Sequence, residues 1–321
     1  MTRVLVTGAS GFVGRALCAA LGEAGHEIVV STRGAAEPWS AGLEIRPIPD
    51  IGPDTDWSGA LAGVDAVAHL AARVHVMKER HAQPLAAYRR VNAEGTRRLA
   101  EAAAANGVRR VVFLSTVKVN GEASGSDPFR ESDAPAPGDD YALSKWEGEQ
   151  ALAEVAARTG LETVVLRPPL VYGPGVKGNF LRLLELCRRA PPLPLGAASN
   201  RRSLIFLGNL ANAVTACLIR PEAAGQTYLV RDGEDVSTAE LIRRVGAALG
   251  RPARLFPVPG VLLRLAGHLT GKSDSVGRLL GSLAIDDGKI RTQLDWAPPF
   301  TMAQGLAETV SWFASRRARD R

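Results

Sequence analysis

Along the first two thirds of the chain, short apolar runs rich in β-branched residues alternate with longer segments of helical periodicity. The strand-like runs cover residues 4–7, 27–32, 43–49, 65–70, 108–116 and 162–166. The helix-like segments between them cover residues 12–24, 84–106 and 140–159. Because strands that alternate with helices form parallel sheets, this pattern predicts an α/β fold built around a parallel sheet.

After Arg167 the pattern changes, and prolines and glycines crowd residues 168–194, which indicates long connections of the kind that often carry binding residues. Strand, helix and strand patterns return at residues 203–207, 209–220 and 226–230. We expect these three segments to rejoin the sheet. Further helices are predicted at residues 237–249, 261–269, 287–294 and 302–316. The first of these opens with Ser237 and Glu240 at capping-box spacing.

The composition is that of a globular protein, with 321 residues, 46% hydrophobic and 22% charged. No run approaches the roughly 18 apolar residues that cross a bilayer, and the chain opens directly into a strand-like run, without the features of a secretory signal. The three cysteines are too few and too scattered for a disulfide framework or a metal site. We therefore expect a cytoplasmic protein without membrane insertion and without a bound metal.

The net charge of +6 raises the question of nucleic-acid binding. However, the arginines are spread along the chain in pairs, at residues 89–90, 97–98 and 109–110 for example, without long basic runs or interleaved aromatic residues. This spacing is typical of solvated helix faces, so we expect no nucleic-acid partner. A local anion site made by one or two arginines is still an alternative interpretation.

A glycine-rich turn follows the first strand directly, with glycines at positions 8, 11 and 14 of the segment TGASGFVG. Glycine allows a tight turn and a close backbone approach, and the helix that follows offers free N–H groups and a partial positive charge to a pyrophosphate. Because strand, turn and helix come in the required order, we predict a dinucleotide site at Gly8, Gly11, Phe12 and Val13.

The end of the second strand bears on which dinucleotide is bound. NAD-specific sites usually place a carboxylate there for the ribose hydroxyls, whereas an arginine suits a 2′-phosphate. Here the strand ends in Arg33 with no acid nearby, and its guanidinium can make a charge-assisted contact. The sequence therefore favours NADP, with NAD and a water-facing Arg33 as the alternative.

Tyr141 and Lys145 lie four residues apart in a predicted helix, so their side chains share one face. A phenol with a pKa near 10 is a poor base at neutral pH, but a nearby ammonium stabilises its anion. Tyr141 could then take a proton from a hydroxyl or give one to a ketone. Ser115 and Thr116, at the end of a predicted strand, are the candidate hydroxyls to orient the reacting oxygen.

Together these motifs resemble the extended short-chain dehydrogenase/reductase family, of the NAD-dependent epimerase/dehydratase type, over essentially the whole chain. The segment VNAEGT at residues 91–96 also matches this family. The resemblance implies a Rossmann-type doubly wound sheet with a smaller, interleaved C-terminal lobe. Residues 1–169 would bind the dinucleotide, with residues 203–235 returning to that domain, and residues 170–321 would mainly form the substrate lobe.

The resemblance also implies roles for single residues. Lys145 should bind the nicotinamide ribose as well, and Thr116 takes the position of the substrate-orienting hydroxyl, with Ser115 as a competitor. Further dinucleotide contacts are implied at Asp50, Ile51, Leu70, Ala71, Ala72 and Asn92. Substrate contacts are implied at Asn179, Arg202 and Arg278. The two arginines suit a diphosphate, because a guanidinium fork matches its oxygens.

Segments at residues 117–122, 201–205 and 281–286 resemble one branch of the family, the bacterial UDP-sugar 4-epimerases and UDP-4-keto-sugar 4-reductases of surface-polysaccharide pathways. Sugar 4,6-dehydratases of the family carry Thr-Asp-Glu where this chain has Thr116, Val117 and Lys118, which argues against a dehydratase. Two departures concern substrate placement: Asn120 replaces an aromatic residue and Asn209 replaces an aspartate.

The substrate is therefore expected to be a nucleotide sugar, and the resemblance implies that it is UDP-linked. The motifs do not distinguish the substituent at C2 of the sugar. Arg33 favours reduction of a UDP-4-keto-deoxysugar. The alternatives are 4-epimerisation of a UDP-hexose or UDP-N-acetylhexosamine, and a non-catalytic dinucleotide-sensing protein, which would typically lack the Tyr/Lys pair. The resemblance implies a homodimer through residues 84–106 and 140–159, and residues 261–269 are expected to form a lobe helix in preference to a membrane-surface helix.

Overall fold

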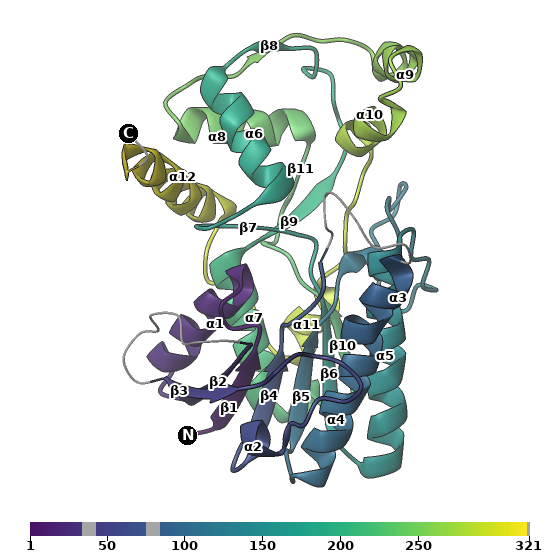
Figure 1. Ribbon diagram of the computed structural model, residues 1–321. Helices are drawn as coiled ribbons and strands as arrows, with labels where there is room; N and C mark the ends of the chain where they lie inside the picture. The colour runs from purple at the N-terminus through teal and green to yellow at the C-terminus, as the bar shows by residue number, and fades with distance from the viewer. Residues whose placement is uncertain (34–42, 75–83, 320–321) are drawn as a thin grey trace.

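A seven-stranded sheet lies at the centre of the computed structural model, which describes residues 1–33, 43–74 and 84–319. The strands follow the order β10-β6-β5-β4-β1-β2-β3, and all neighbouring strands run parallel (Figure 1). They are β1 (Arg3–Thr7), β2 (Glu27–Thr32), β3 (Glu44–Pro47), β4 (Ala66–His69), β5 (Arg110–Leu114), β6 (Glu162–Arg167) and β10 (Thr227–Leu229).

Helices cover both faces of this sheet. On one face lie α1 (Phe12–Glu23) and α7 (Leu207–Ile219), and on the other lie α4 (Gly95–Ala105) and α5 (Asp140–Thr159). The short helices α2 (Ser58–Leu61), α3 (Pro84–Arg89) and α11 (Gly288–Gln293) complete this part of the molecule. A parallel sheet with helices on both faces confirms the predicted Rossmann-type fold.

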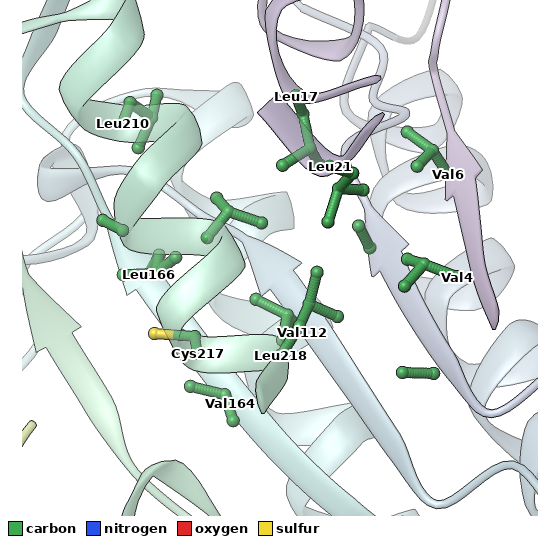
Figure 2. Packing of buried hydrophobic residues seen from close by; sticks show 14 of the residues in the cluster. Val4, Val6, Leu17, Leu21, Val112, Val164, Leu166, Leu210, Cys217 and Leu218 are labelled. Carbon is green, nitrogen blue, oxygen red and sulfur yellow. The ribbon is translucent and has the colours of Figure 1, made fainter. Parts of the chain in front are cut away.

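The alternation of side chains along each strand decides which helix a residue meets. Val4 and Val6 of β1 pack with Leu17 and Leu21 of α1 in one apolar cluster (Figure 2). Leu5, which lies between them in the strand, belongs to the cluster on the opposite face. Because both faces are covered, the strands are apolar throughout, as is typical of parallel sheets.

The predicted elements of the first two thirds are present, with ends that differ from the prediction by at most two residues. One of them is interrupted. The predicted helix 84–106 consists of α3, a π-helical segment (Arg90–Glu94) and α4. Asn92 lies in the π-helical segment and is buried, and π-helical turns of this kind often occur at functional sites.

A smaller lobe lies beyond the carboxyl edge of the large sheet (Figure 1). The chain enters this lobe after Arg167, where β6 ends and β7 soon follows. Its strands are β7 (Leu170–Tyr172), β8 (Pro192–Leu193), β9 (Arg202–Phe206), β11 (Asp235–Val236) and β12 (Arg254–Leu255). Its helices are α6 (Gly178–Arg189), α8 (Thr238–Ala248), α9 (Gly260–Leu269), α10 (Ser273–Leu280) and α12 (Met302–Arg319).

One expectation for the segment after residue 203 needs correction. Helix α7 packs on the large sheet and β10 pairs with β6, as expected. Strand β9 instead joins a separate three-stranded sheet, where it runs parallel to β7 and antiparallel to β11. The strand pattern of residues 203–207 was therefore predicted correctly, but its pairing was not, because pairing depends on β7, which the sequence pattern did not indicate.

Among the residues that the structure describes, no helix combines the length and the apolarity needed to cross a membrane.

Leu21 provides a test of the packing between α1 and the sheet. Its side chain is fully buried in the cluster of Figure 2, so Leu21→Ala should lower the free energy of unfolding by about 2–5 kcal/mol. Ile219 at the end of α7 is 42% exposed, and Ile219→Ala should change stability by about 1 kcal/mol or less. Urea denaturation of both variants measures the difference, and equal losses would contradict the packing described.

Candidate active site

The glycine turn after β1 leaves no room for side chains. Gly8 has a φ of +70°, and a Cβ there would lie 2.8 Å from the backbone nitrogen of Ala71. A Cβ on Gly14 would lie 2.2 Å from the carbonyl oxygen of Gly8. The turn is closed by a hydrogen bond of 2.9 Å from the Gly11 N–H to the Gly8 oxygen. These glycines therefore hold the start of α1 directly against the ends of β1 and β4.

The start of α1 is suited to an anion. Its N-cap is Gly11, which offers no side-chain cap, and its first turn contains no acidic residue. The N–H groups and the partial positive charge of the helix end therefore face outward from the sheet edge without competition from a carboxylate. Phe12 and Val13, which open the helix, are partly buried and contact the core of the smaller lobe.

The end of β2 offers further polar groups. Ser31 is buried, and its Oγ has no hydrogen-bond partner among the described residues. Arg33 is 72% exposed in its side chain, and its Nη1 lies 3.7 Å from an Asp50 Oδ1. Ile51, next to Asp50, is buried. The glycine cradle, the uncapped helix end and the unpartnered Ser31 hydroxyl fit the phosphates and ribose of a dinucleotide.

His69 at the end of β4 has hydrogen bonds at both ring nitrogens. Its Nδ1 lies 2.7 Å from Oγ1 of Thr7, and its Nε2 lies 3.0 Å from Oγ1 of Thr96. The Thr96 hydroxyl donates to the carbonyl oxygen of Asn92 over 2.8 Å, so its oxygen must accept the proton of Nε2. Burial, with Lys145 adding to the effect, lowers the pKa of His69 to about 3. His69 is therefore a neutral link between β1, β4 and α4.

The residues after His69 lie at the carboxyl end of β4, at the edge of the sheet. Leu70, Ala71 and Ala72 are partly buried, and the Ala71 N–H donates to the Thr7 hydroxyl over 3.2 Å. Asn92, which we predicted as a dinucleotide contact, uses both ends of its amide within the protein. Its Oδ1 accepts from the Arg73 N–H, and its Nδ2 donates to the Arg73 carbonyl and to Ser144 Oγ, each over 2.9 Å.

Lys145 is buried against an aromatic ring. Its Nζ lies 3.8 Å from the ring centroid of Phe113, and the same ring stacks on His69 with a centroid distance of 5.5 Å. Burial lowers the pKa of Lys145 to about 7, and the carboxylate of Glu149 acts against this shift. At neutral pH the ammonium and the free amine are therefore both populated, which suits a group that exchanges protons.

Tyr141 lies in the first turn of α5, next to Asp139, the N-cap. Burial raises the pKa of Tyr141 to about 12, and the negative charge of Asp139 and the nearby Tyr88 contribute. The Tyr88 and Tyr141 rings meet edge to face at 6.3 Å. Our expectation that a nearby ammonium lowers this pKa is not met, because burial has the largest effect on Tyr141 and the Nζ of Lys145 lies over the ring of Phe113.

Lys118 balances the charge of Asp139. Its Nζ lies 2.7 Å from an Asp139 carboxylate oxygen and 2.9 Å from Glu122. The other Asp139 oxygen accepts from the Ala142 N–H over 2.7 Å and so caps α5. This ion pair ties the turn after Thr116 to the helix end that carries Tyr141.

A buried network uses the hydroxyl of Ser115. Ser115 donates to Glu149, which forms an ion pair of 2.5 Å with Arg167. Arg167 also donates to Oδ1 of Asn120 over 3.1 Å. All four side chains are buried. We did not predict Glu149 and Arg167 from the sequence, although a carboxylate four residues after Lys145 on the same helix face was a usable signal.

Thr116 has a different environment from that of Ser115. It is only partly buried, and its Oγ1 accepts from the Lys118 N–H over 3.3 Å. This backbone contact uses the oxygen as an acceptor and leaves the hydroxyl proton available as a donor. The structure thus commits Ser115 to Glu149 and favours Thr116 as the hydroxyl that orients a substrate.

The predicted substrate residues lie in the smaller lobe. Nη1 of Arg202, at the start of β9, donates to the carbonyl oxygens of Arg278 and Gly281 over 2.8 and 3.1 Å. These bonds place α10 beside Arg202, so the two candidate arginines are neighbours. Asn179 is exposed near the start of α6. Asn209, the second departure, bonds Asp232 and the backbone of Phe300 and is part of the lobe's framework.

Comparisons with known proteins point to one family. The profile of the NAD dependent epimerase/dehydratase family matches residues 4–230. The chain is 42% identical to the UDP-glucose 4-epimerase of Vibrio cholerae over 318 residues, which cover 98% of this chain and 97% of the relative.

Two solved structures extend the comparison. The protein MoeE5 in complex with UDP-glucose and NAD is 26% identical, with a TM-score of 0.75 and coverage of 99% of both chains. The UDP-glucuronic acid 4-epimerase of Bacillus cereus in complex with NAD is 22% identical, with a TM-score of 0.77 over 98% of this chain and 97% of that one. The latter likeness concerns the fold.

The cradle can be tested at Gly14. Gly14→Ala forces backbone atoms apart, and a strain on the order of 1–3 kcal/mol should weaken dinucleotide binding about tenfold or more. Gly22→Ala is the matched control in the same helix, because the nearest atom to a Cβ there is Ile28 Cδ1 at 3.7 Å. Titration calorimetry with NAD and NADP measures both variants. Unchanged affinity in Gly14→Ala would contradict the cradle.

Substitutions of the two hydroxyl residues after β5, Ser115 and Thr116, should have different effects on kcat and on stability. We expect Thr116→Val to lower kcat on the order of a hundredfold, because a donor to the reacting oxygen is lost. Ser115→Ala should instead lower stability by about 1.5–3 kcal/mol through the bond to Glu149 and leave kcat within a fewfold. Steady-state kinetics and urea unfolding of both variants decide, and the reverse pattern would assign the role to Ser115.

The pH dependence can be tested at Asp139. Its negative charge raises the pKa of Tyr141, so Asp139→Asn should lower that pKa. The limb of the kcat/KM profile that rises as Tyr141 loses its proton should move to lower pH by up to about one unit. The amide still caps α5. Glu122→Gln, which removes another partner of Lys118, is the control. A shift to higher pH in Asp139→Asn would refute the assignment.

Proposed function

Because the chain belongs to the NAD-dependent epimerase/dehydratase family, we propose that it is a 4-epimerase of UDP-linked hexoses with NAD as its resident dinucleotide. It is an enzyme of the extended short-chain dehydrogenase/reductase type. The observation that carries the proposal is its similarity to a UDP-glucose 4-epimerase over nearly the full length of both chains, together with the retained Tyr141, Lys145 and Thr116.

In this proposal the ionised phenol of Tyr141 removes the proton of the sugar 4-hydroxyl and later returns it, while Thr116 donates a hydrogen bond to the same oxygen. When bound, NAD would supply the hydride acceptor and donor for C4, and its positive nicotinamide ring would favour ionisation of Tyr141, whose pKa burial holds at about 12 in the protein alone. Lys145 shares the helix face of Tyr141, and its pKa of about 7 lets Nζ hold or release a proton at neutral pH. Lys145 itself is buried away from bulk water.

The NAD contacts are proposed along the carboxyl edge of the large sheet. Gly8, Gly11 and the first turn of α1 hold the pyrophosphate, and Ser31 faces the adenosine ribose. Asp50 and Ile51 border the adenine, while residues 70–72 line the nicotinamide half. Asn92 supports the NAD site without a side-chain contact to NAD, because its amide is bonded to Arg73 and Ser144.

The UDP-sugar contacts are proposed in the smaller lobe. Arg202 and Arg278 hold the diphosphate, since backbone carbonyls fix the guanidinium of Arg202 beside α10. Asn179 adds a contact near the start of α6. Holding the diphosphate in the lobe presents the sugar to the sheet edge, where Tyr141 and Thr116 lie.

Reduction of a UDP-4-keto-deoxysugar, which Arg33 favoured in the sequence, has weaker support. An epimerase keeps its dinucleotide because the hydride returns to the same sugar, whereas a reductase must exchange it in every cycle. Arg33 is largely exposed and lies beside Asp50, so its positive charge is partly balanced where a 2′-phosphate would bind. NADP use therefore stays a prediction, and NAD is the choice consistent with epimerisation.

The proposal is tested by following UDP-glucose and UDP-N-acetylglucosamine by proton NMR with purified protein and no added dinucleotide. We expect conversion of at least one of them to its C4 epimer, with NAD released when the protein is denatured. Tyr141→Phe should lower the rate on the order of a hundredfold or more and leave the NAD content unchanged. Absence of epimer together with NADPH oxidation by a UDP-4-keto-sugar would establish the reductase instead.

A further inference from the structure

The exposed apolar side chains of the described residues are concentrated in one segment. Ten large apolar residues are exposed, and six of them lie between residues 256 and 279. These are Phe256, Val261, Leu262, Leu265, Leu269 and Leu279. Four of the six belong to α9, a helix of ten residues at the outer end of the smaller lobe (Figure 1). Such a concentration marks a docking surface more often than chance exposure.

The apolar residues of α9 form a stripe along one side of the helix. Val261, Leu265 and Leu269 are spaced by four residues and therefore share a face, with Leu262 beside them. Val261 and Leu269 are each 76% exposed, and Leu262 and Leu265 are each 54% exposed. More than half of each side chain is exposed, and none of the four belongs to the apolar cluster described for the lobe.

The opposite side of α9 accounts for its contacts with the lobe. Gly267 is buried, and a Cβ there would lie 2.8 Å from a methyl carbon of Val276 in α10. Leu263 is partly buried and packs on the lobe core together with Leu280. The helix is thus held by its narrow inner face, while the wider apolar stripe stays outside.

Basic residues surround the stripe. Residues 251–280 contain five arginine or lysine residues and one acidic residue, Asp274. Arg264 and His268 lie within α9, Lys272 lies in the turn that follows it, and all three are exposed. An apolar face flanked by cations on a short exposed helix is the pattern of helices that lie in the interface of an anionic membrane.

The same charges argue against a second copy of this chain as the occupant. A symmetric contact through the stripe would bring Arg264, His268 and Lys272 of one copy near the same cations of the other. A stripe of four side chains is also narrow for an interface that needs about 800 Å² on each partner. An anionic lipid bilayer offers apolar acyl chains to the stripe and negative headgroups to the surrounding cations.

In contrast to our expectation from the sequence that residues 261–269 form a lobe helix without a membrane role, we propose that α9 and the start of α10 dock this enzyme on anionic lipid bilayers, with the stripe Val261, Leu262, Leu265 and Leu269 inserted at the headgroup level. The sugar-nucleotide site itself is not part of this surface, so docking places the enzyme without altering its chemistry.

The experiment is flotation of the full-length protein with vesicles of phosphatidylglycerol and phosphatidylethanolamine, compared with vesicles of phosphatidylcholine alone. We expect binding to the anionic vesicles, and a loss of about tenfold or more in Leu265→Gln/Leu269→Gln, where buried apolar area is removed. Lys272→Gln should lower binding about fivefold, the effect of one cation near the surface. Ile219→Gln, an exposed aliphatic change outside the lobe, is the matched control and should bind like the wild type.

Epimerisation of UDP-sugar in solution is measured on the same variants and should be unchanged in all of them, so failure of the docking proposal is distinguishable from failure of the proposed function. Wild-type protein that binds anionic and zwitterionic vesicles equally weakly would overturn the proposal. Equal binding by wild type and Leu265→Gln/Leu269→Gln would overturn it as well. Light scattering that shows these two changes dissociating an oligomer would assign the stripe to a second copy instead.

Discussion

The parallel pairing of β1, β4 and β5 is the constraint on which the candidate site depends. Its register sets Thr7 opposite His69 and His69 opposite Phe113 at the carboxyl edge. Burial keeps the imidazole of His69 neutral, and Thr7 and Thr96 bond its two ring nitrogens. The ring of Phe113 stacks on His69 and also contacts the ammonium of Lys145. A slip of one residue in either pair would turn these side chains to the wrong face.

This arrangement divides the polar groups near β5 between two tasks. Ser115, Glu149 and Arg167 satisfy one another in the interior and hold α5 against the sheet. Breaking one of these contacts would leave a buried charge unpaired, which is strongly destabilising. The network therefore holds its members in one arrangement. Thr116 follows β5, while Tyr141 and Lys145 lie in the first two turns of α5. The buried network therefore fixes the helix that carries Tyr141 and Lys145.

Local patterns were sufficient to predict the strands, most helices, the glycine turn and the Tyr141/Lys145 pair, because each depends on neighbours within a few residues. They were insufficient wherever distant segments decide the outcome. The pairing of β9 with β7, the ion pair of Arg33 with Asp50 and the bond of Ser115 to Glu149 join residues far apart in sequence. The raised pKa of Tyr141 likewise follows from burial, which the spacing of Tyr141 and Lys145 does not reveal.

We propose that the hydride leaves C4 of a UDP-sugar and returns to that same molecule. An isotope crossover measures this directly: a mixture of unlabelled UDP-glucose and carbon-13 UDP-glucose carrying deuterium at C4 is converted to product and analysed by mass spectrometry. We expect that deuterium stays only in the carbon-13 UDP-galactose. Deuterium that appears in the unlabelled product, or is lost from the sugars into free dinucleotide, would contradict it.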